Sequence, residues 1–348
     1  MRTLTRLIAA LVAASFAPAV ASAKLNIVTT ATDYADIARR VGGDHVDVYS
    51  IMKGPENIHN VMAKPTEMVR LNAADLFVHS GLDTEPWRDN LLKGARNPRV
   101  MFGKPGYVDM SDGVPLKEVP TGKIDRSMGD VHAYGNPHYT LNPQIAQRMA
   151  VTMTRALVAT DPANAADYKA NAKRFVVEMG DLSREVKAAF APYAGLKVVT
   201  FHRAWEYFAD AVDLTLVGTI EPQVSITPSP AQVRQTIDLM RREGVKVVIC
   251  ETYDDDKLAR YVADQAGAKM VVLPDHVNGV PGTDTYQQLF RYNVAKLIET
   301  ARAAGVQPKP VTAEAATPGP PAGEVRPPAN GAGTSGGGST PGNSSGGN

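Results

Sequence analysis

Short apolar runs alternate with amphipathic helical patterns along most of this chain. The runs have the length and β-branched content of buried strands, and the segments between them repeat apolar residues at helical spacing. The apolar runs are residues 25–30, 45–52, 98–102, 196–201, 214–220, 245–250 and 268–273, the helical patterns are residues 34–41, 87–95, 206–212, 229–244, 256–265 and 285–305, and residues 65–80 join a helical pattern to a final apolar run. This alternation predicts an α/β protein with mostly parallel sheets and helices on both faces.

The alternation occurs twice, which predicts two similar Rossmann-like lobes, each with a mostly parallel four-stranded sheet. We expect an N-terminal β/α lobe at residues 24–141 and a C-terminal β/α lobe at residues 194–307. Residues 142–193 carry helical periodicity that is interrupted at Asp161-Pro162, where Asp can cap a helix and Pro can begin one. This stretch predicts a helical connector, with a long helix that joins the lobes.

The two ends of the chain differ from this body. A basic start and the apolar stretch LIAALVAASF lead to the small residues ASA, which is typical of a secretory signal peptide. We expect the signal peptide to occupy residues 1–23, with cleavage before Lys24. Residues 308–348 are rich in Pro, Gly, Ser, Thr and Ala and have few large apolar side chains, so this tail is predicted to be disordered.

Composition narrows the compartment and the partners. The net charge is +1 and aromatic residues make up 6% of the chain, so the basic surface and stacking residues typical of nucleic-acid binding are missing. No apolar stretch reaches the roughly 20 residues that span a bilayer. Cys250 is the only cysteine, so no intramolecular disulfide can form and no cysteine at the cleavage site can carry a lipid. We expect a periplasmic monomer that does not span the membrane.

Three histidines far apart in the sequence are candidate metal ligands. His59 lies on the loop after one predicted strand, His202 directly follows another, and His138 precedes the connector. Asp275 follows the last predicted strand. Because parallel sheets bind ligands at the carboxyl ends of their strands, these four side chains are expected to face a cleft shared by the lobes. Three neutral imidazoles and one carboxylate complete a tetrahedral Zn²⁺ shell without an open position, which favours holding a metal over catalysis.

Five segments of the chain together resemble a known family. They read P-E-N-I-H-N, K-P-T-E-M-V-R-L-N-A-A-D-L-F-V-H-S-G-L-D-T-E-P-W, N-P-H-Y-T-L-N-P, P-S-P-A-Q and G-T-D-T-Y. In this combination the chain, from residue 25 to about residue 306, resembles the periplasmic solute-binding proteins of zinc and manganese ABC importers, the ZnuA/TroA-like family or cluster A-I.

The resemblance implies one metal bound between two β/α lobes, which a long helix bridges, by one ligand from each of four segments. It places His59, His138 and His202 at the family's nitrogen positions and Asp275 at its carboxylate position. Manganese-type members tend to have glutamate at the third position, so His202 favours zinc, with Mn²⁺ as the alternative. The implied partners are an ABC importer membrane permease with its cytoplasmic ATPase, and a periplasmic metallochaperone is a candidate metal source.

Two segments depart from the family pattern and leave the fourth ligand open. N-I-H stands where D-P-H is usual at the first histidine, and L-P-D-H stands where L-D-P-L or V-D-S-L is usual around the carboxylate. Glu251 at a predicted strand end and His132, six residues before His138, are the alternatives to Asp275.

The remaining candidates are expected to have other roles. We expect His45 to be a solvated turn residue and His79 to pack beside the site or support it. Strand alternation would direct His276 away from a metal held by the residue before it. Trp87 is expected to pack within its lobe and Glu85 to lie at the surface.

Two other classes of function compete with metal capture. A secreted zinc hydrolase needs an open coordination position and a general base, and the common H-E-x-x-H motif is absent from the sequence. A metal-binding surface adhesin or scaffold is suggested mainly by the low-complexity tail, whose G-x-S-x-G match at residues 333–337 has no flanking strand or helix. The sequence contains no Walker-type phosphate loop, so ATP hydrolysis would belong to a partner. The sequence therefore predicts a binding protein and not an enzyme.

Overall fold

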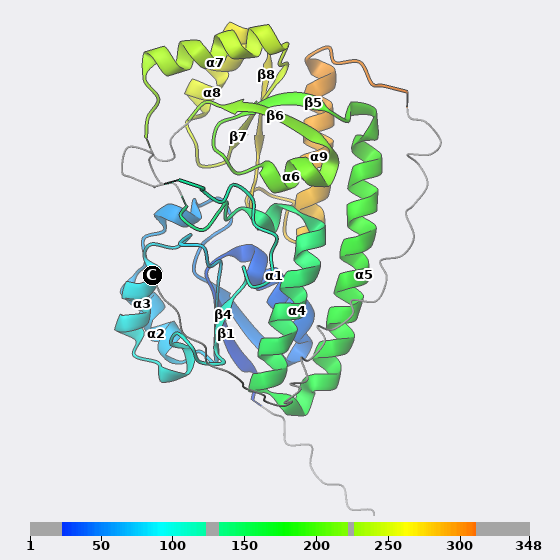
Figure 1. The fold of residues 1–348 in the computed structure, drawn as a ribbon. Helices are drawn as coiled ribbons and strands as arrows, with labels where there is room; N and C mark the ends of the chain where they lie inside the picture. Colours follow the sequence, from blue (N-terminus) through cyan, green and yellow to red (C-terminus); the bar gives the residue numbers. More distant parts are fainter. Residues whose placement is uncertain (1–22, 123–131, 222–225, 311–348) are drawn as a thin grey trace, which may run out of the picture. The chain divides into compact units, whose positions relative to one another are not determined.

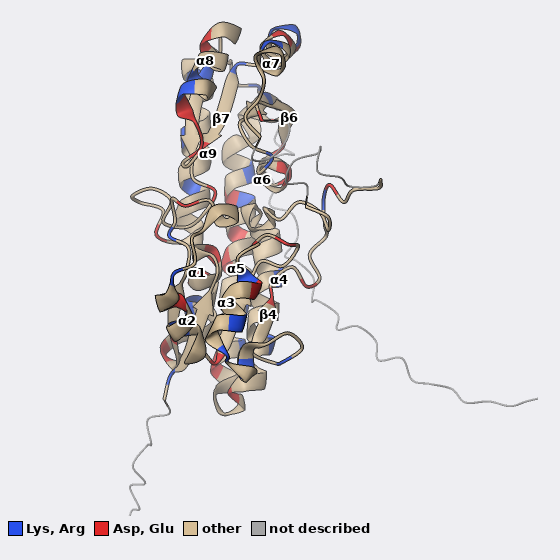
Figure 2. Cartoon of the chain, turned by 90° about the vertical axis from the view of Figure 1, so that its left-hand side faces the viewer, with Lys and Arg blue, Asp and Glu red and all other residues tan. Residues whose placement is uncertain are grey.

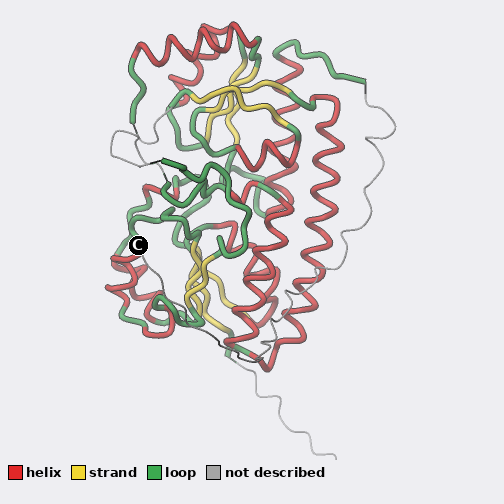
Figure 3. The backbone as a smooth tube through the Cα atoms, viewed as in Figure 1, coloured by secondary structure: helices red, strands yellow, loops and turns green. Residues whose placement is uncertain are grey.

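Two four-stranded parallel sheets, each covered by helices, form the body of the protein (Figure 1; Figure 3). The computed structural model describes residues 23–122, 132–221 and 226–310. The predicted signal peptide lies outside these residues except for its last position, and the predicted tail lies outside them beyond residue 310. The α/β class with two lobes of parallel strands is confirmed.

The sheet of the N-terminal lobe has four parallel strands in the order β2-β1-β3-β4. Their bounds are Leu25–Thr29 for β1, Val46–Ser50 for β2, Leu76–His79 for β3 and Tyr107–Asp109 for β4. The helices of this lobe are α1 (Thr32–Gly42), α2 (Pro65–Asn72) and α3 (Arg88–Ala95). Every residue of β3 is buried, as expected for a central strand with helices on both faces.

The C-terminal lobe repeats this arrangement with the order β6-β5-β7-β8. Its strands are β5 (Leu196–Thr200), β6 (Leu214–Thr219), β7 (Val247–Glu251) and β8 (Lys269–Leu273). Its helices are α6 (Glu206–Val212), α7 (Pro230–Glu243), α8 (Asp256–Ala266) and α9 (Tyr286–Ala303). Capping boxes at Ser229 and Thr285 begin α7 and α9 by satisfying backbone N–H groups of the first turn. Because the strand order is the same and all strands are parallel, the carboxyl ends of equivalent strands lie at one edge of each sheet.

Two helices occupy the predicted connector. Asn142 caps α4 (Pro143–Thr160), and the break at Asp161-Pro162 separates it from α5 (Ala165–Phe190). With 26 residues, α5 is about 39 Å long, and it contacts α1 of one lobe and α6 and α9 of the other. α4 packs against α5 and α1. The long joining helix is therefore α5.

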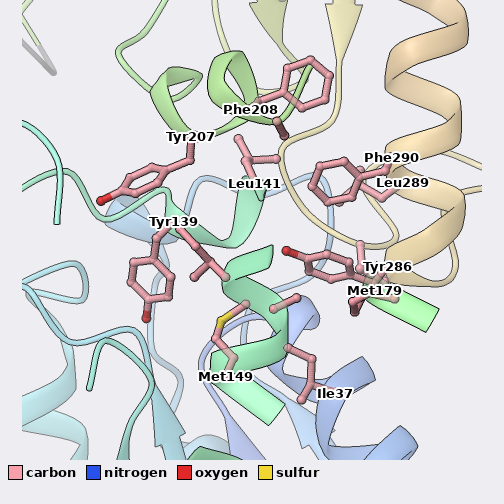
Figure 4. Packing of buried hydrophobic residues seen from close by; sticks show 14 of the residues in the cluster. Ile37, Tyr139, Leu141, Met149, Met179, Tyr207, Phe208, Tyr286, Leu289 and Phe290 are labelled. Atoms are coloured by element: carbon pink, nitrogen blue, oxygen red, sulfur yellow. The ribbon is translucent and has the colours of Figure 1, made fainter. Parts of the chain in front are cut away.

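One apolar cluster is continuous through both lobes. It joins Ile37 of α1, Met149 of α4 and Met179 of α5 to Leu289 and Phe290 of α9 (Figure 4). Two further clusters lie on the other sides of the sheets, one in each lobe. This cluster contains buried residues of both lobes and of the helices between them. The burial of this apolar surface holds the two lobes together.

One strand was predicted at the wrong place. Residues 98–102 were expected to form a strand, but a 3₁₀ turn spans Pro98–Val100 and the fourth strand is β4, further along the chain. Asn97 accounts for the difference: its side chain accepts a hydrogen bond from the Arg99 N–H and donates to the backbone carbonyls of Leu71, in the last turn of α2, and Ala74, just after it. This capping fixes a turn where Val100 is buried without joining the sheet.

Charges are mixed over the described part of the chain. In Figure 2, Lys and Arg are interspersed with Asp and Glu along the helices of both lobes, and neither sign covers one side of this view. Among the described helices, none combines the length and the apolar content required to cross a membrane.

Candidate metal centre

Three histidines from separate loops meet between the sheets. His59 lies in the 3₁₀ turn Ile58–Asn60 after β2, His138 directly precedes the turn that leads into α4, and His202 lies two residues after β5. All three are buried, and one ring nitrogen from each lies within 4.8 Å of the other two. The Nε2 atoms of His138 and His202 are 3.3 Å apart. The chain thus places three imidazole donors close enough to share one ion.

The orientation of His59 is determined by two short contacts. Its backbone N–H donates to Oδ1 of Asn57 at 2.9 Å, and its Nδ1 lies 3.2 Å from the carbonyl oxygen of Thr84. A carbonyl can only accept a hydrogen bond, so Nδ1 carries the hydrogen and the lone pair lies on Nε2. This Nε2 atom is buried and has no hydrogen-bond partner among the described residues. His59 therefore presents an uncommitted lone pair to the cluster.

The environment keeps two of these imidazoles uncharged. Burial, followed by the nearby His132 and His202, holds the pKa of His59 well below its usual range. Burial, followed by His202 and His59, does the same to the pKa of His138. Both rings are neutral near pH 7, which is the form that binds metal.

Asp275 is not part of the three-histidine group. Its Oδ2 accepts a hydrogen bond from the Tyr253 hydroxyl at 2.7 Å and lies 3.5 Å from Nε2 of His276. Its Oδ1 is buried and has no hydrogen-bond partner among the described residues. One carboxylate oxygen of Asp275 is therefore held in place and the other is available.

The two alternative fourth ligands differ in position. Glu251, at the end of β7, accepts a 2.6 Å hydrogen bond from Trp205 Nε1. Burial raises the pKa of Glu251 well above its usual range, and the neighbouring carboxyl group of Asp254 raises it further. Trp205 thus holds Oε1 of Glu251, while Oε2 has no hydrogen-bond partner among the described residues. The ring of His132 lies 4.8 Å from that of His59, centroid to centroid.

His276 lies close to the site, contrary to the expectation that it points away. It is buried, pairs through Nδ1 with Asp33 of α1, and its charge lowers the pKa of His59 and His138. Burial lowers the pKa of His276, but Asp275 and Asp33 outweigh burial and raise it to about 9. Strand alternation did not apply because β8 ends at Leu273 and the chain bends at Asp275 and His276.

Two carboxylates near the site were misjudged or missed from the sequence. Glu85 was expected at the surface, but it is 2% exposed, and its Oε1 accepts hydrogen bonds from Thr30 and Ser80. Glu221, two residues beyond β6, lies 3.9 Å from Nδ1 of His202. Its place just after a strand was the available signal, because the same rule selected His202 and Asp275.

The other residues expected to be secondary lie outside the three-histidine group. His45 is partly exposed and lies 2.9 Å from a carboxylate oxygen of Asp167. His79 is buried, packs against the Tyr107 ring at 4.4 Å between centroids and accepts a hydrogen bond from the Gly81 N–H. Trp87 packs in a cluster of the N-terminal lobe.

Comparison with known proteins gives a consistent family. Residues 27–300 match the sequence family described as ZnuA, zinc-uptake complex component A periplasmic. The iron-binding protein YfeA of Yersinia pestis is 27% identical over 282 residues, which are 80% of this chain and 86% of that protein. The manganese ABC transporter substrate-binding lipoprotein PsaA of Streptococcus anginosus is 24% identical over 79% of this chain and 89% of that protein.

The fold is also similar to solved structures. The crystal structure of ZnuA aligns with a TM-score of 0.67 at 24% identity and covers 80% of this chain and 99% of that chain. The names of these similar proteins refer to zinc, iron and manganese. The comparisons therefore agree on the fold and on metal binding, while the metal named differs from one protein to the next.

Proposed function

We propose that this chain, which belongs to the ZnuA family of periplasmic zinc-uptake components, captures Zn²⁺ between its lobes and delivers it to an ABC importer. Its relatives are substrate-binding proteins of metal ABC transporters and not enzymes, and such proteins work with a permease and an ATPase. The choice of zinc rests on one observation: the buried donor group consists of three imidazoles. Imidazole-rich sites suit Zn²⁺, whereas Mn²⁺ prefers more oxygen ligands.

The spacing of the donors supports a tetrahedral site. Two nitrogens bound to one Zn²⁺ at 2.0–2.1 Å and tetrahedral angles are about 3.3 Å apart. The Nε2 atoms of His138 and His202 are separated by 3.3 Å, and the third nitrogen lies within 4.8 Å. A movement of about 1–2 Å by His59 would complete three corners of the shell.

We propose Asp275 as the fourth ligand, through its available Oδ1. Its approach requires a local movement of the loop after β8, because Asp275 lies outside the histidine group. His132 is the competing fourth ligand, supported by its ring position beside His59. Glu251 is the weakest of the three, since Trp205 already bonds one of its oxygens and burial raises its pKa well above the usual range, which favours the neutral carboxyl group over the carboxylate that binds metal.

Manganese is the second candidate cargo, and one feature of the site favours it. Oxygen donors lie beside His202: Glu221 is 3.9 Å from its Nδ1, and Asp254 is close enough for His202 to lower its pKa against the effect of burial. Mn²⁺ could recruit such carboxylates if the loops around them adjusted.

Metal content after competition tests the proposal. The full mature chain, from residue 24, is stripped with a chelator, equilibrated with equal Zn²⁺ and Mn²⁺, and analysed for both elements. We expect one zinc per chain in the native protein, loss of zinc in His202→Ala, and unchanged zinc in the matched control His45→Ala, whose side chain lies outside the site. If the chain retains manganese instead of zinc, the cargo assignment changes to Mn²⁺. Absence of both metals would refute metal capture.

The fourth ligand is tested by comparing Asp275→Asn, His132→Ala and Glu251→Gln. The variant that removes the true ligand should weaken zinc binding by roughly 100-fold, and the others should change it several-fold at most. A large loss in His132→Ala with none in Asp275→Asn would transfer the assignment to His132.

A further inference from the structure

The turn after β3, residues 80–85, has an unusual backbone. Gly81, Leu82 and Asp83 have φ values of 70°, 53° and 58°, so three successive residues are in the left-handed region. For the two residues other than glycine this conformation costs about 1–2 kcal/mol each. A Cβ at Gly81 would lie 2.2 Å from a carboxylate oxygen of Asp109, so a larger residue there would have to displace the Asp109 side chain. The surrounding contacts therefore impose a specific path on this turn.

The carboxyl group of Glu85 closes the 80–85 turn. Its Oε1 accepts hydrogen bonds from the Ser80 N–H at 2.7 Å and from the Thr30 hydroxyl at 2.6 Å. Thr84 is held as well, because its N–H and its hydroxyl both donate to the Gly81 carbonyl, at 3.0 and 2.6 Å. The first and last residues of the turn are thus tied together, and the direction of the Thr84 carbonyl is determined.

The same turn contacts the segments of two proposed ligands. The Thr84 carbonyl faces Nδ1 of His59 at 3.2 Å. The Ser80 carbonyl accepts a 2.6 Å hydrogen bond from the hydroxyl of Tyr139, the neighbour of His138. In Figure 4 this hydroxyl points away from the side chains of Tyr207 and Phe208. The 80–85 turn therefore links the positions of His59 and His138.

A second contact extends this link to the His59 segment. The indole N–H of Trp87, two residues after Glu85, donates to the carbonyl of Ile58 at 3.0 Å. The residue before His59 and the ring of His59 are both bonded to one short stretch of chain. Movement of residues 84–87 would shift the His59 ring. It would also remove the acceptor that keeps the ring hydrogen on Nδ1.

We infer that Glu85 is a positioning residue for metal capture: by closing the 80–85 turn it holds the Thr84 carbonyl against His59, so that His59 offers Nε2 at a defined distance from His138. The inference rests on the proposed function, because it assigns Glu85 a role in that site. Groups that orient metal ligands change metal affinity by about 10- to 100-fold when they are removed. We expect the same effect here.

The test combines zinc affinity with the tautomer of His59 in the metal-free chain. Glu85→Ala removes the oxygen that accepts from Ser80 and Thr30. Glu85→Gln keeps an acceptor oxygen on a side chain of the same shape, and Glu67→Ala is the matched control. Glu67 is also buried in the N-terminal lobe, but it bonds to Tyr49 and not to the turn. Affinity is measured by competition with a chelator of known affinity, and the tautomer by ¹⁵N NMR of the imidazole nitrogens.

We expect Glu85→Ala to lose about 10- to 100-fold in zinc affinity and to lose the single Nδ1–H tautomer of His59. Glu85→Gln and Glu67→Ala should keep both native values. Native affinity and a native tautomer in Glu85→Ala would overturn the inference. If Glu85→Ala does not fold, Thr30→Val removes one donor to Glu85 and should give a smaller loss of both properties, and an unchanged tautomer in that variant would also refute it.

The two hypotheses can fail separately. If the native chain binds no metal, the proposed function is wrong, while the His59 tautomer still reports whether Glu85 controls the ring. If the native chain binds zinc and Glu85→Ala binds it equally well, only the positioning role is wrong.

Discussion

The two sides of the candidate site hold their donors in different ways. On the N-terminal side, uncharged hydrogen bonds connect His59 and the neighbour of His138 to the single turn at residues 80–85. On the C-terminal side, His202 lies among carboxylates, with Glu221 at 3.9 Å and Asp254 nearby. The first arrangement sets geometry in advance of binding. The second supplies charge that can rearrange around an ion.

Three carboxyl groups of the C-terminal side have raised pKa values or lack, within the described part of the chain, a hydrogen-bond partner for one of their oxygens. Burial raises the pKa of Asp254 and, to a larger extent, that of the neighbouring Glu251. Asp275 has one oxygen bonded to Tyr253 and one without a partner among the described residues. A divalent cation would stabilise the ionised form of these carboxyl groups. The difference between the sides suggests that the N-terminal lobe determines where the ion binds and the C-terminal lobe influences which ion it is.

The largest effect should come from removing an imidazole. We expect His59→Ala, His138→Ala and His202→Ala each to weaken zinc binding by roughly 100- to 1000-fold, because a four-ligand zinc site contributes about 3 kcal/mol per ligand. Isothermal titration with a competing chelator measures the loss, and circular dichroism checks the fold. Native affinity in two of the three variants would exclude this site.

A smaller effect should distinguish the two sides by metal preference. His202→Glu exchanges a nitrogen donor for an oxygen donor on the C-terminal side, so the ratio of Mn²⁺ to Zn²⁺ affinity should rise by about tenfold or more. His59→Glu should weaken both metals without this change in ratio, since the Thr84 carbonyl would face a carboxylate with no hydrogen to donate. Equal shifts in both variants would remove the proposed division of roles.

Replacing a buried carboxyl group in either lobe should change how the stability of the chain depends on pH. Burial raises the pKa of Glu85 above 4.5 and raises that of Glu251 further. The stability that such a group contributes is fully present below about pH 4.5 and is lost as the pH rises through its folded pKa. Glu85→Gln and Glu251→Gln should therefore gain melting temperature relative to the native chain as the pH rises.

The pH range of the gain identifies each group. In Glu85→Gln the gain should be complete at a lower pH than in Glu251→Gln, because the pKa of Glu85 is less strongly raised. Thermal melts of the metal-free chain between about pH 4.5 and 8.5 measure this difference. Identical profiles would show that the two carboxyl groups do not differ in environment.

The smallest effect should come from an exposed contact between the lobes. Lys117 pairs with Asp210 of α6 at 2.6 Å, with 35% and 55% of the side chains exposed. Lys117→Ala should change the free energy of unfolding by about 0.5 kcal/mol or less, and zinc affinity should not change. Chemical denaturation at low and high salt measures it. A large loss of affinity would mean that this exposed pair helps to hold the site together.

Much of the architecture was accessible from local pattern. The apolar runs predicted parallel sheets in two lobes, and the break at Asp161-Pro162 coincides with the boundary between α4 and α5. The error at residues 98–102 arose because Asn97 bonds to carbonyls more than 20 residues away in the sequence. Such a contact leaves no signature in the run of apolar residues itself.

The candidate ligands could be selected from sequence because they follow strands or precede a helix, and the carboxyl ends of parallel strands meet at one edge. That rule selects His59 and His202 as candidates without coordinates, and the position before a helix selects His138. It cannot say which nitrogen of His59 carries hydrogen, that Glu85 is buried under the turn, or that His276 turns back toward Asp33. The first two features depend on contacts within the folded N-terminal lobe, between residues up to 55 positions apart. The third joins residues 243 positions apart, so it exists only once the two lobes have packed together.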